Sequence, residues 1–232
     1  MRLALLFQDA DDGFFPSFWS EARAVGIPKP GSRDLRPLTI LSVFYRTWAR
    51  RHASDGYLWL NAWAPPGLRG GRPTHSAADC SWDVGLRVFA SCSGADPSRH
   101  AIFVDTEKCF DRFLIGAIFI VAEFVGVPPR ILRVARLYRS LRRLLFVNGR
   151  PTHWLILPDD DIECCGLPQG CPLAPLFCNI AMAVWENSLL HAGCSALFSY
   201  LDDRTFFASS LALLDKFMGT TYAVDSFFAK YA

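Results

Sequence analysis

Along this 232-residue chain, some segments repeat apolar residues every three to four positions, which is typical of helices, and others are short apolar runs, which are typical of strands. Helical spacing predicts helices at 40–51, 77–92, 110–126, 130–141 and 175–192, and again after residue 209. Short runs rich in β-branched and aromatic residues predict strands at 101–105, 144–147, 153–157, 197–201 and 204–208. Residues 1–36 look irregular, because prolines and glycines interrupt them.

Cap and turn residues support these boundaries. Ser76 is a suitable N-cap for the second helix, and Gly126 is a suitable end for the third. Asn148 and Gly149 predict a hairpin turn, and the Asp202–Asp203 pair predicts another. The order strand, two helices, hairpin, helix, hairpin, helix indicates an α+β fold with an antiparallel sheet backed by helices.

Composition narrows the class of protein. A chain that is 51% hydrophobic and 20% charged is ordinary for a globular protein, and the net charge of +2 does not indicate a polyanion partner. Arginines do gather between 130 and 150, where they form either a local basic binding surface or a solvated helix face. Eight cysteines show no zinc-ligand spacing, which favours reduced intracellular thiols.

Membrane and secretion signals are weak. The N-terminal stretch lacks a persuasive signal-peptide cleavage site. The longest apolar run, 113–127, is interrupted by Glu123 and is too short for an ordinary membrane span. We therefore expect an intracellular protein of the nucleus or cytoplasm, without membrane contact, and the sequence predicts no oligomeric state.

Candidate chemistry begins with two adjacent carboxylates, Asp202 and Asp203, inside the apolar run FSYLDDRTFF (198–207). Like charges this close are driven toward protonation unless a cation holds them. Oxygen ligands at a water-accessible turn suit Mg²⁺ or Mn²⁺. Asp105, which ends another apolar run, is the best candidate for a third ligand. The alternatives are a solvated β-turn and a simple strand-end acid.

Five stretches in a fixed order resemble reverse transcriptases, most closely those of non-LTR (LINE-type) retrotransposons. They are RPLTILSVFYRTWAR (36–50), GGRPTHSAADC (70–80), IFVDTEKCFDRF (102–113), GLPQGCPLAPLFCNIAM (166–182) and YLDD (200–203). The resemblance covers roughly residues 27–208. Their order and spacing together are stronger evidence than any one motif.

The resemblance implies a right-hand polymerase palm with partial fingers, in which residues 1–100 are fingers and 101–232 are palm, truncated before a thumb. It implies an RNA-directed DNA polymerase that uses an RNA template, a DNA primer and dNTPs. Asp105, Asp202 and Asp203 would hold two Mg²⁺ ions, with Mn²⁺ as a substitute and the Thr106 carbonyl as a further ligand.

The resemblance also implies substrate contacts. Phe110 would be a steric gate that excludes a 2′-hydroxyl, and Gln169 would lie along the incoming nucleotide. Gly170, with Gly166, would permit close backbone approach. Arg36 and Lys29 would hold the triphosphate. The corresponding structural alternatives are a core phenylalanine, an ordinary loop and solvated surface cations.

Two other functions remain open from the sequence. One is another right-hand polymerase that copies RNA into RNA; Phe110 and the LPQG loop favour DNA synthesis instead. The other is a catalytically inert remnant that at most binds nucleic acid, which the lack of recognisable thumb motifs after residue 208 favours.

Overall fold

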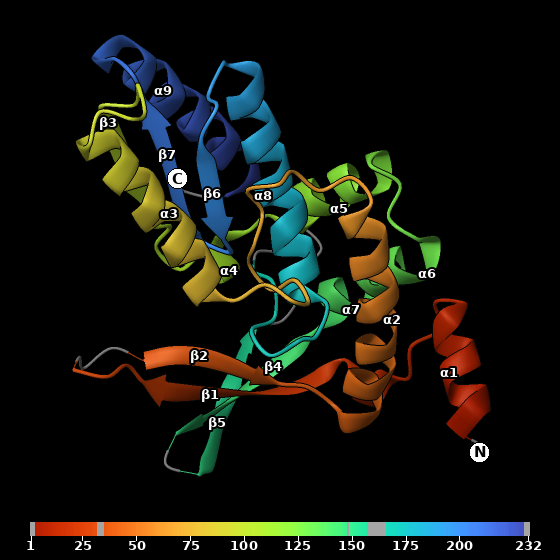
Figure 1. The fold of residues 1–232 in the computed structure, drawn as a ribbon. Helices are drawn as coiled ribbons and strands as arrows, with labels where there is room; N and C mark the ends of the chain where they lie inside the picture. Colours follow the sequence, from red (N-terminus) through yellow and green to blue (C-terminus); the bar gives the residue numbers. More distant parts are fainter. Residues whose placement is uncertain (1–2, 32–34, 148, 157–165, 230–232) are drawn as a thin grey trace. The chain divides into compact units, whose positions relative to one another are not determined.

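The computed structural model describes residues 3–31, 35–147, 149–156 and 166–229 (Figure 1). The chain forms two compact units, and each is made of two separate segments. Unit 1 comprises Met1–Trp59 and Phe110–Ala174, and unit 2 comprises Leu60–Cys109 and Pro175–Ala232. These bounds do not coincide with the division predicted at residue 100.

Unit 1 contains a four-stranded sheet and several helices. Its elements are α1 (Leu3–Asp11), the 3-10 turn η1 (Ser17–Trp19), β1 (Glu21–Pro28), β2 (Leu35–Ile40), α2 (Val43–Asn61), α4 (Cys109–Arg112), α5 (Ile115–Phe124), α6 (Pro129–Leu132), α7 (Val134–Ser140), β4 (Arg142–Val147) and β5 (Arg150–Ile156). The strand order is β2-β1-β4-β5. Because β1 runs parallel to β4 while the other pairs are antiparallel, this sheet is mixed.

The prediction that residues 1–36 are irregular was wrong. They contain α1 and β1, and β1 is the second strand of the sheet. The strand is hard to recognise because its buried positions are the small residues Ala22 and Ala24, which alternate with the exposed Arg23. Alanine has little preference for strands, so the alternation carries a weak signal.

Two predicted helices are each divided in the structure. The helix predicted at 110–126 is α4 and α5, separated at Phe113 and Leu114. The Phe113 carbonyl accepts a hydrogen bond from Gly166, which replaces a helical partner. The helix predicted at 130–141 is α6 and α7. Gly126, with φ of +78°, ends α5 as predicted.

An aromatic cluster and a partly buried hydrogen-bond network hold α1 on α2. The Trp19 ring packs edge-on against Tyr45 and at a tilt against Trp48. Asp11 accepts a hydrogen bond from Trp48 Nε1 at 2.7 Å, and its Oδ1 lies 2.7 Å from His52 Nε2. The unpredicted N-terminal helix is therefore an integral part of unit 1.

Unit 2 contains the second sheet. Its elements are α3 (Ala77–Cys92), β3 (His100–Val104), α8 (Ala174–His191), β6 (Leu197–Tyr200), β7 (Asp203–Ala208) and α9 (Leu211–Phe228). The strand order β3-β7-β6 is antiparallel throughout, as predicted. Ser76 caps α3 in a reciprocal capping box with Asp79, so the predicted start of that helix is confirmed.

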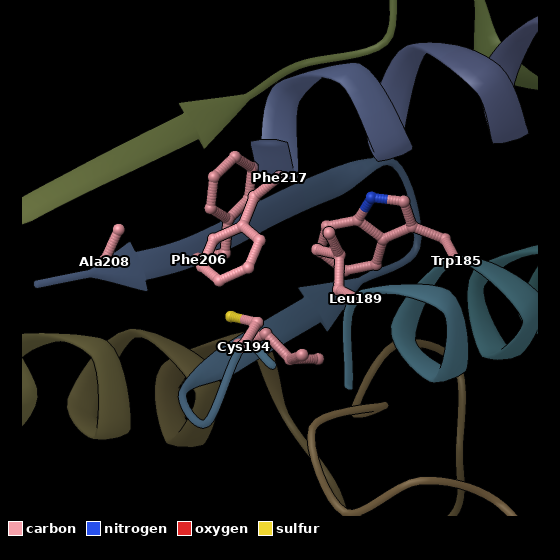
Figure 2. Packing of buried hydrophobic residues seen from close by; sticks show 7 residues of the cluster. Trp185, Leu189, Cys194, Phe206, Ala208 and Phe217 are labelled. Carbon is pink, nitrogen blue, oxygen red and sulfur yellow. The ribbon is translucent and has the colours of Figure 1, made fainter. Parts of the chain in front are cut away.

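One face of the unit 2 sheet is covered by helices. Figure 2 shows Trp185 and Leu189 of α8 and Phe217 of α9 gathered around Phe206 of β7. Ile102 and Val104 of β3 pack against the same cluster. The predicted α+β class, with an antiparallel sheet backed by helices, is confirmed for this unit.

The predicted hairpin at 144–157 exists as β4 and β5, with Gly149 at φ of +75°, while Asn148 and Leu157 lie outside the described residues. Among the helices of the described segments, none is long and apolar enough to span a lipid bilayer.

Candidate active site

The three candidate carboxylates lie at one end of the unit 2 sheet. Val104 pairs with Arg204 in the β3–β7 ladder, so Asp105, one residue further, stands opposite Asp203. Tyr200 pairs with Asp203 across the β6–β7 hairpin. The turn therefore consists of Leu201 and Asp202, and Asp203 is the first residue of β7 rather than part of the turn.

Strand alternation determines which face of the sheet each carboxylate at a strand end occupies. Val104 and Arg204 face the side covered by α8 and α9. Neighbouring residues of a strand point to opposite faces, which places Asp105 and Asp203 on the other face. Both are exposed, and Asp202 is half-buried. The site combines a fixed backbone with access to water.

Electrostatics shows that the three acids influence one another. Burial raises the pKa of Asp202 above its usual value of 3.8, and the charges of Asp203 and Asp105 raise it further. A backbone hydrogen bond and the nearby Arg204 oppose this shift without cancelling it. Ionised Asp202 is thus destabilised unless a cation offsets the repulsion.

The donor chemistry fits a hard divalent cation, since all three acids offer carboxylate oxygens. Within residues 3–31, 35–147, 149–156 and 166–229, however, no three His, Cys, Asp or Glu side chains are arranged to hold one ion. Coordination of Mg²⁺ or Mn²⁺ by Asp105, Thr106, Asp202 and Asp203 stays a prediction.

A glycine-containing segment, Gly67–Gly70, lies along the free edge of β6. Ser199 donates its N–H to the Gly67 carbonyl at 3.0 Å and accepts the Arg69 N–H at 2.8 Å. Asn179 of α8 donates to the Gly70 carbonyl at 2.7 Å. A Cβ on Gly67 would lie 2.5 Å from the Leu197 carbonyl oxygen, so glycine is required there. Nothing in the sequence indicates that Gly67 packs against β6, and Gly70 is predicted only as the start of the motif at 70–80.

A buried acid beneath the hairpin was also missed. Glu186 of α8 is fully buried, and its Oε1 accepts a hydrogen bond from Ser199 Oγ at 2.6 Å. Burial raises the pKa of Glu186 to about 8, against the effects of this hydrogen bond and of Arg72 and Arg69. At neutral pH the side chain is therefore largely the neutral acid, which a buried site tolerates.

The candidate nucleotide-binding residues belong to unit 1. Gly166 and Leu167 donate their N–H groups to the carbonyls of Phe113 and Phe110 at 2.8 and 2.7 Å. Gln169 Nε2 donates to Asp111 Oδ2 at 3.1 Å. The structure therefore joins the LPQG loop to the segment that carries the half-buried Phe110, although their roles toward a nucleotide stay predictions.

The same loop contacts β2. Thr39 donates its N–H to the Gln169 carbonyl at 2.7 Å. Gly170 has φ of +109°, and a Cβ there would lie 2.6 Å from the Thr39 carbonyl oxygen. Gly170 thus permits the approach of two backbones to each other. Its role beside a bound nucleotide stays a prediction.

Arg36 and Lys29 lie on the β1–β2 hairpin. Arg36 is exposed in β2 and pairs with Ile27 of β1. Lys29 follows the last residue of β1 and is half-buried. Both cations are thus carried by the same hairpin, and binding of a triphosphate by them stays a prediction.

Cys171 anchors the end of the LPQG loop in a way that the sequence did not indicate. Tyr45 Oη lies 3.0 Å from its Sγ, and Tyr138 Oη donates to the same sulfur at 2.9 Å. Burial raises the pKa of the Cys171 thiol, although both tyrosine hydrogen bonds lower it. A neutral buried thiol therefore fixes this loop to α2 and α7.

The exposed carboxylates at a hairpin, on an antiparallel sheet backed by helices, are the arrangement of a right-hand polymerase palm. Residues 27–230 match the family of reverse transcriptases (RNA-dependent DNA polymerases). The chain belongs to this family, because the match extends over most of its length.

Solved structures support the fold. A telomerase from Candida tropicalis, truncated from its C-terminal domain, superimposes with a TM-score of 0.63 at 15% identity and covers 91% of this chain. A Candida tropicalis telomerase in complex with a fragment of telomeric RNA superimposes with a TM-score of 0.65 at 14% identity and covers 92% of this chain. This chain spans 48% and 40% of those two proteins. At such identities the likeness establishes the fold alone.

Proposed function

We propose that this chain is the RNA-directed DNA polymerase domain of a retroelement of the non-LTR (LINE) type. The observation that carries the proposal is the β3–β7 register, which sets Asp105 opposite Asp203 with Asp202 adjacent. Membership in the reverse transcriptase family supplies the reaction class. The order of the motifs at 36–50, 70–80, 102–113, 166–182 and 200–203 supports the LINE subtype.

The reaction would join a dNTP to the 3′-hydroxyl of a DNA primer on an RNA template, in the nucleus or the cytoplasm. Two bound divalent cations, Mg²⁺ or Mn²⁺, would activate the hydroxyl and neutralise the triphosphate. Asp105, Asp202 and Asp203 would hold them, with the Thr106 carbonyl as a further ligand. Because the carboxylates stand on strand ends, the sheet fixes their backbone positions.

Substrate selection would fall to unit 1. The Phe110 ring would restrict the space beside the sugar and so exclude a 2′-hydroxyl. Gln169 would lie along the incoming nucleotide from a loop that Thr39 and Cys171 hold in place. Arg36 and Lys29 would bind triphosphate oxygens, which guanidinium and ammonium groups suit.

The test is single-nucleotide extension of a DNA primer annealed to RNA, with Mg²⁺ and the purified chain. We expect dNTP addition by the wild type and none by Asp202→Asn. Asp215→Asn, an exposed acid on α9, is the matched control and should extend as the wild type does. Template mutations that change which dNTP is added would confirm that the RNA directs the reaction.

The competing functions give different products. Preferential addition of rNTPs would identify an RNA-directed RNA polymerase. Binding of the primer–template without any addition, under conditions where the chain is folded, would identify an inert remnant. Extension by Asp202→Asn equal to that of the wild type would remove the proposed site.

A further inference from the structure

A buried arginine lies directly behind the candidate carboxylates. The Arg204 side chain has no exposure to solvent, although it follows the exposed Asp203 in β7. Its Nη1 and Nη2 donate to the two carboxylate oxygens of Asp225 at 2.7 and 2.8 Å. Nη2 also donates to Thr106 Oγ1 at 2.8 Å. The guanidinium carbon lies 5.2 Å from the centre of the Trp185 ring.

This arrangement satisfies a charge that would otherwise be costly. A buried guanidinium needs an opposite charge and hydrogen-bond acceptors with good geometry. Asp225 of α9 supplies the charge in a two-pronged contact, which arginine makes and lysine cannot reproduce. The face of Trp185 adds a favourable cation–π contact.

The two partners of Arg204 belong to different parts of unit 2. Thr106 directly follows Asp105 beyond β3, whereas Asp225 lies near the end of α9. Arg204 itself directly follows Asp203. One side chain therefore joins the backbone beside Asp105 to the backbone beside Asp203, and α9 holds that side chain in place.

We propose that Arg204 is a positioning residue for the carboxylate site, with Asp225 as its anchor on α9. Its bond to Thr106 fixes the separation between the end of β3 and the β6–β7 hairpin. The spacing of two metal ions is narrow, about 3.5–4 Å, so the separation of their ligands must be held closely. The inference rests on the proposed function, because it assumes that the acids bind cations.

A purely structural role is the alternative, in which Arg204 only stabilises unit 2. Thr106→Val separates the two roles, because it removes the hydroxyl acceptor while leaving the residue's carbonyl and its approximate volume. Thr221→Val is the matched control. Thr221 is a buried threonine of α9 that accepts a hydrogen bond from Trp185 Nε1 at 3.0 Å. It shares the neighbour Trp185 with Arg204, but within the described residues it makes no hydrogen bond to Arg204 or Thr106.

The first measurement is Mn²⁺ binding by the full chain without nucleic acid, detected by electron paramagnetic resonance. We expect Thr106→Val and Asp225→Asn to weaken Mn²⁺ binding by roughly 10–100-fold, the usual effect of losing groups that orient metal ligands. Thr221→Val should destabilise the chain but bind Mn²⁺ as the wild type does. Arg204→Lys, which keeps the charge without the two-pronged contact, should resemble Asp225→Asn.

The second measurement needs no metal. Amide hydrogen exchange with chelator present should be faster around Asp105 and Thr106 in Thr106→Val and Asp225→Asn. It should not be faster there in Thr221→Val, which loses a hydrogen bond to Trp185 but keeps the bonds of Arg204 to Thr106 and Asp225. This readout separates local positioning from general stability.

The outcomes divide cleanly. If the wild type binds no Mn²⁺, or if Asp202→Asn does not abolish that binding, the proposed metal site fails and the inference fails with it. If wild-type binding depends on Asp202 but Thr106→Val binds Mn²⁺ as tightly as Thr221→Val, the proposed function stands and Arg204 is structural only. Unchanged exchange around Asp105 in Asp225→Asn would also overturn the positioning role.

Discussion

Gly70 packs so closely against Leu201 that a Cβ at position 70 would overlap the amide nitrogen of Leu201. Leu201 occupies the left-handed region, with φ of +57°, directly before Asp202. A non-glycine residue rarely adopts this conformation unless its surroundings impose it. The Gly67–Gly70 segment therefore has a direct influence on the shape of the turn that carries Asp202.

Replacing Gly70 with alanine should force this turn away from its position. The contacted atoms belong to the backbone and cannot move aside as a side chain would, so we expect a loss of at least about 1–3 kcal/mol in the free energy of unfolding. Primer extension should fall even where the chain remains folded, because Leu201 adjoins Asp202. Urea denaturation and extension by the same preparation measure the two effects.

Gly85→Ala is the control for that substitution. Gly85 lies within α3, and no atom outside its own helix lies within 4 Å of an added Cβ. Alanine should stabilise this helix by about 0.5–1 kcal/mol. Equal stability of Gly70→Ala and the wild type would contradict the close contact.

Asp202→Asn should be at least as stable as the wild type at neutral pH in the presence of a chelator. The folded-state pKa of Asp202 is raised above 3.8 by burial and by Asp203 and Asp105, so ionisation opposes folding. The penalty is absent below about pH 3.8 and complete above the folded-state pKa. The stability advantage of the mutant should therefore shrink as the pH falls toward 3.8.

Chemical denaturation at several pH values measures this difference, with Asp215→Asn as the control. A mutant that is less stable than the wild type at pH 7 would show that the carboxylate of Asp202 contributes favourable contacts that outweigh the repulsion. Loss of extension together with retained stability would separate chemistry from folding.

Glu186→Gln should flatten the pH dependence of stability. The pKa of Glu186 rises from 4.5 to about 8 on folding because the side chain is buried. Between these values the wild type should lose on the order of 1.4 kcal/mol per pH unit from this group as the pH rises. Glutamine keeps an acceptor for Ser199 Oγ and does not ionise, so its curve should lack this slope.

The comparison is made by denaturation between pH 4.5 and 8, as the difference between wild type and mutant. Glu123→Gln, on the exposed side of α5, corrects for the loss of a surface carboxylate. Parallel curves for the wild type and Glu186→Gln would show that Glu186 does not titrate as a buried acid.

Phe110→Val should open space for a 2′-hydroxyl and leave the carboxylates intact. If Phe110 is the gate, the incorporation of rNTPs relative to dNTPs should rise well beyond the ~10-fold that 1.4 kcal/mol represents. If Phe110 is only a core residue, discrimination between rNTPs and dNTPs should stay unchanged. The free energy of unfolding should fall instead, by on the order of 3–5 kcal/mol for the alanine variant. Matched extension assays and denaturation of the same variants measure both quantities.

Phe124→Val provides the control for Phe110. Phe124 ends α5 and is 90% exposed, so its replacement should change neither stability nor nucleotide choice. A folded Phe110→Val that rejects rNTPs as the wild type does would show that Phe110 is not the gate. The preference for DNA over RNA synthesis would then lose its main residue.

The sequence predicted unit 2 well because its signals are local. The apolar run ending at Val104, the Ser76 cap and the apolar strands flanking Asp202 each specify an element without distant partners. Strand β1 was missed because Ala22 and Ala24 give little hydrophobic contrast. The parallel pairing with β4 depends on residues more than a hundred positions away, which no local pattern reveals.

The site was predicted in part for the same reason. Acids at apolar strand ends are visible in the sequence, so Asp105, Asp202 and Asp203 could be proposed. Arg204 and Glu186 could not, because burial of a charged residue depends on a partner distant in the chain. The requirement for glycine at 67 and 70 likewise arises from backbones that meet only in the folded structure.

The interleaving of the two units has a consequence for biosynthesis. Strand β3 ends at Val104, but its sheet partner Arg204 is made 100 residues later. At a synthesis rate of about 5–20 residues per second, an apolar strand waits ~5–20 s for its neighbour. Unpaired strands of this kind invite association with other chains, and pairing across so long a loop is slow. Productive folding of unit 2 is therefore a late event, which makes expression yield sensitive to translation speed and to chaperones that shield β3.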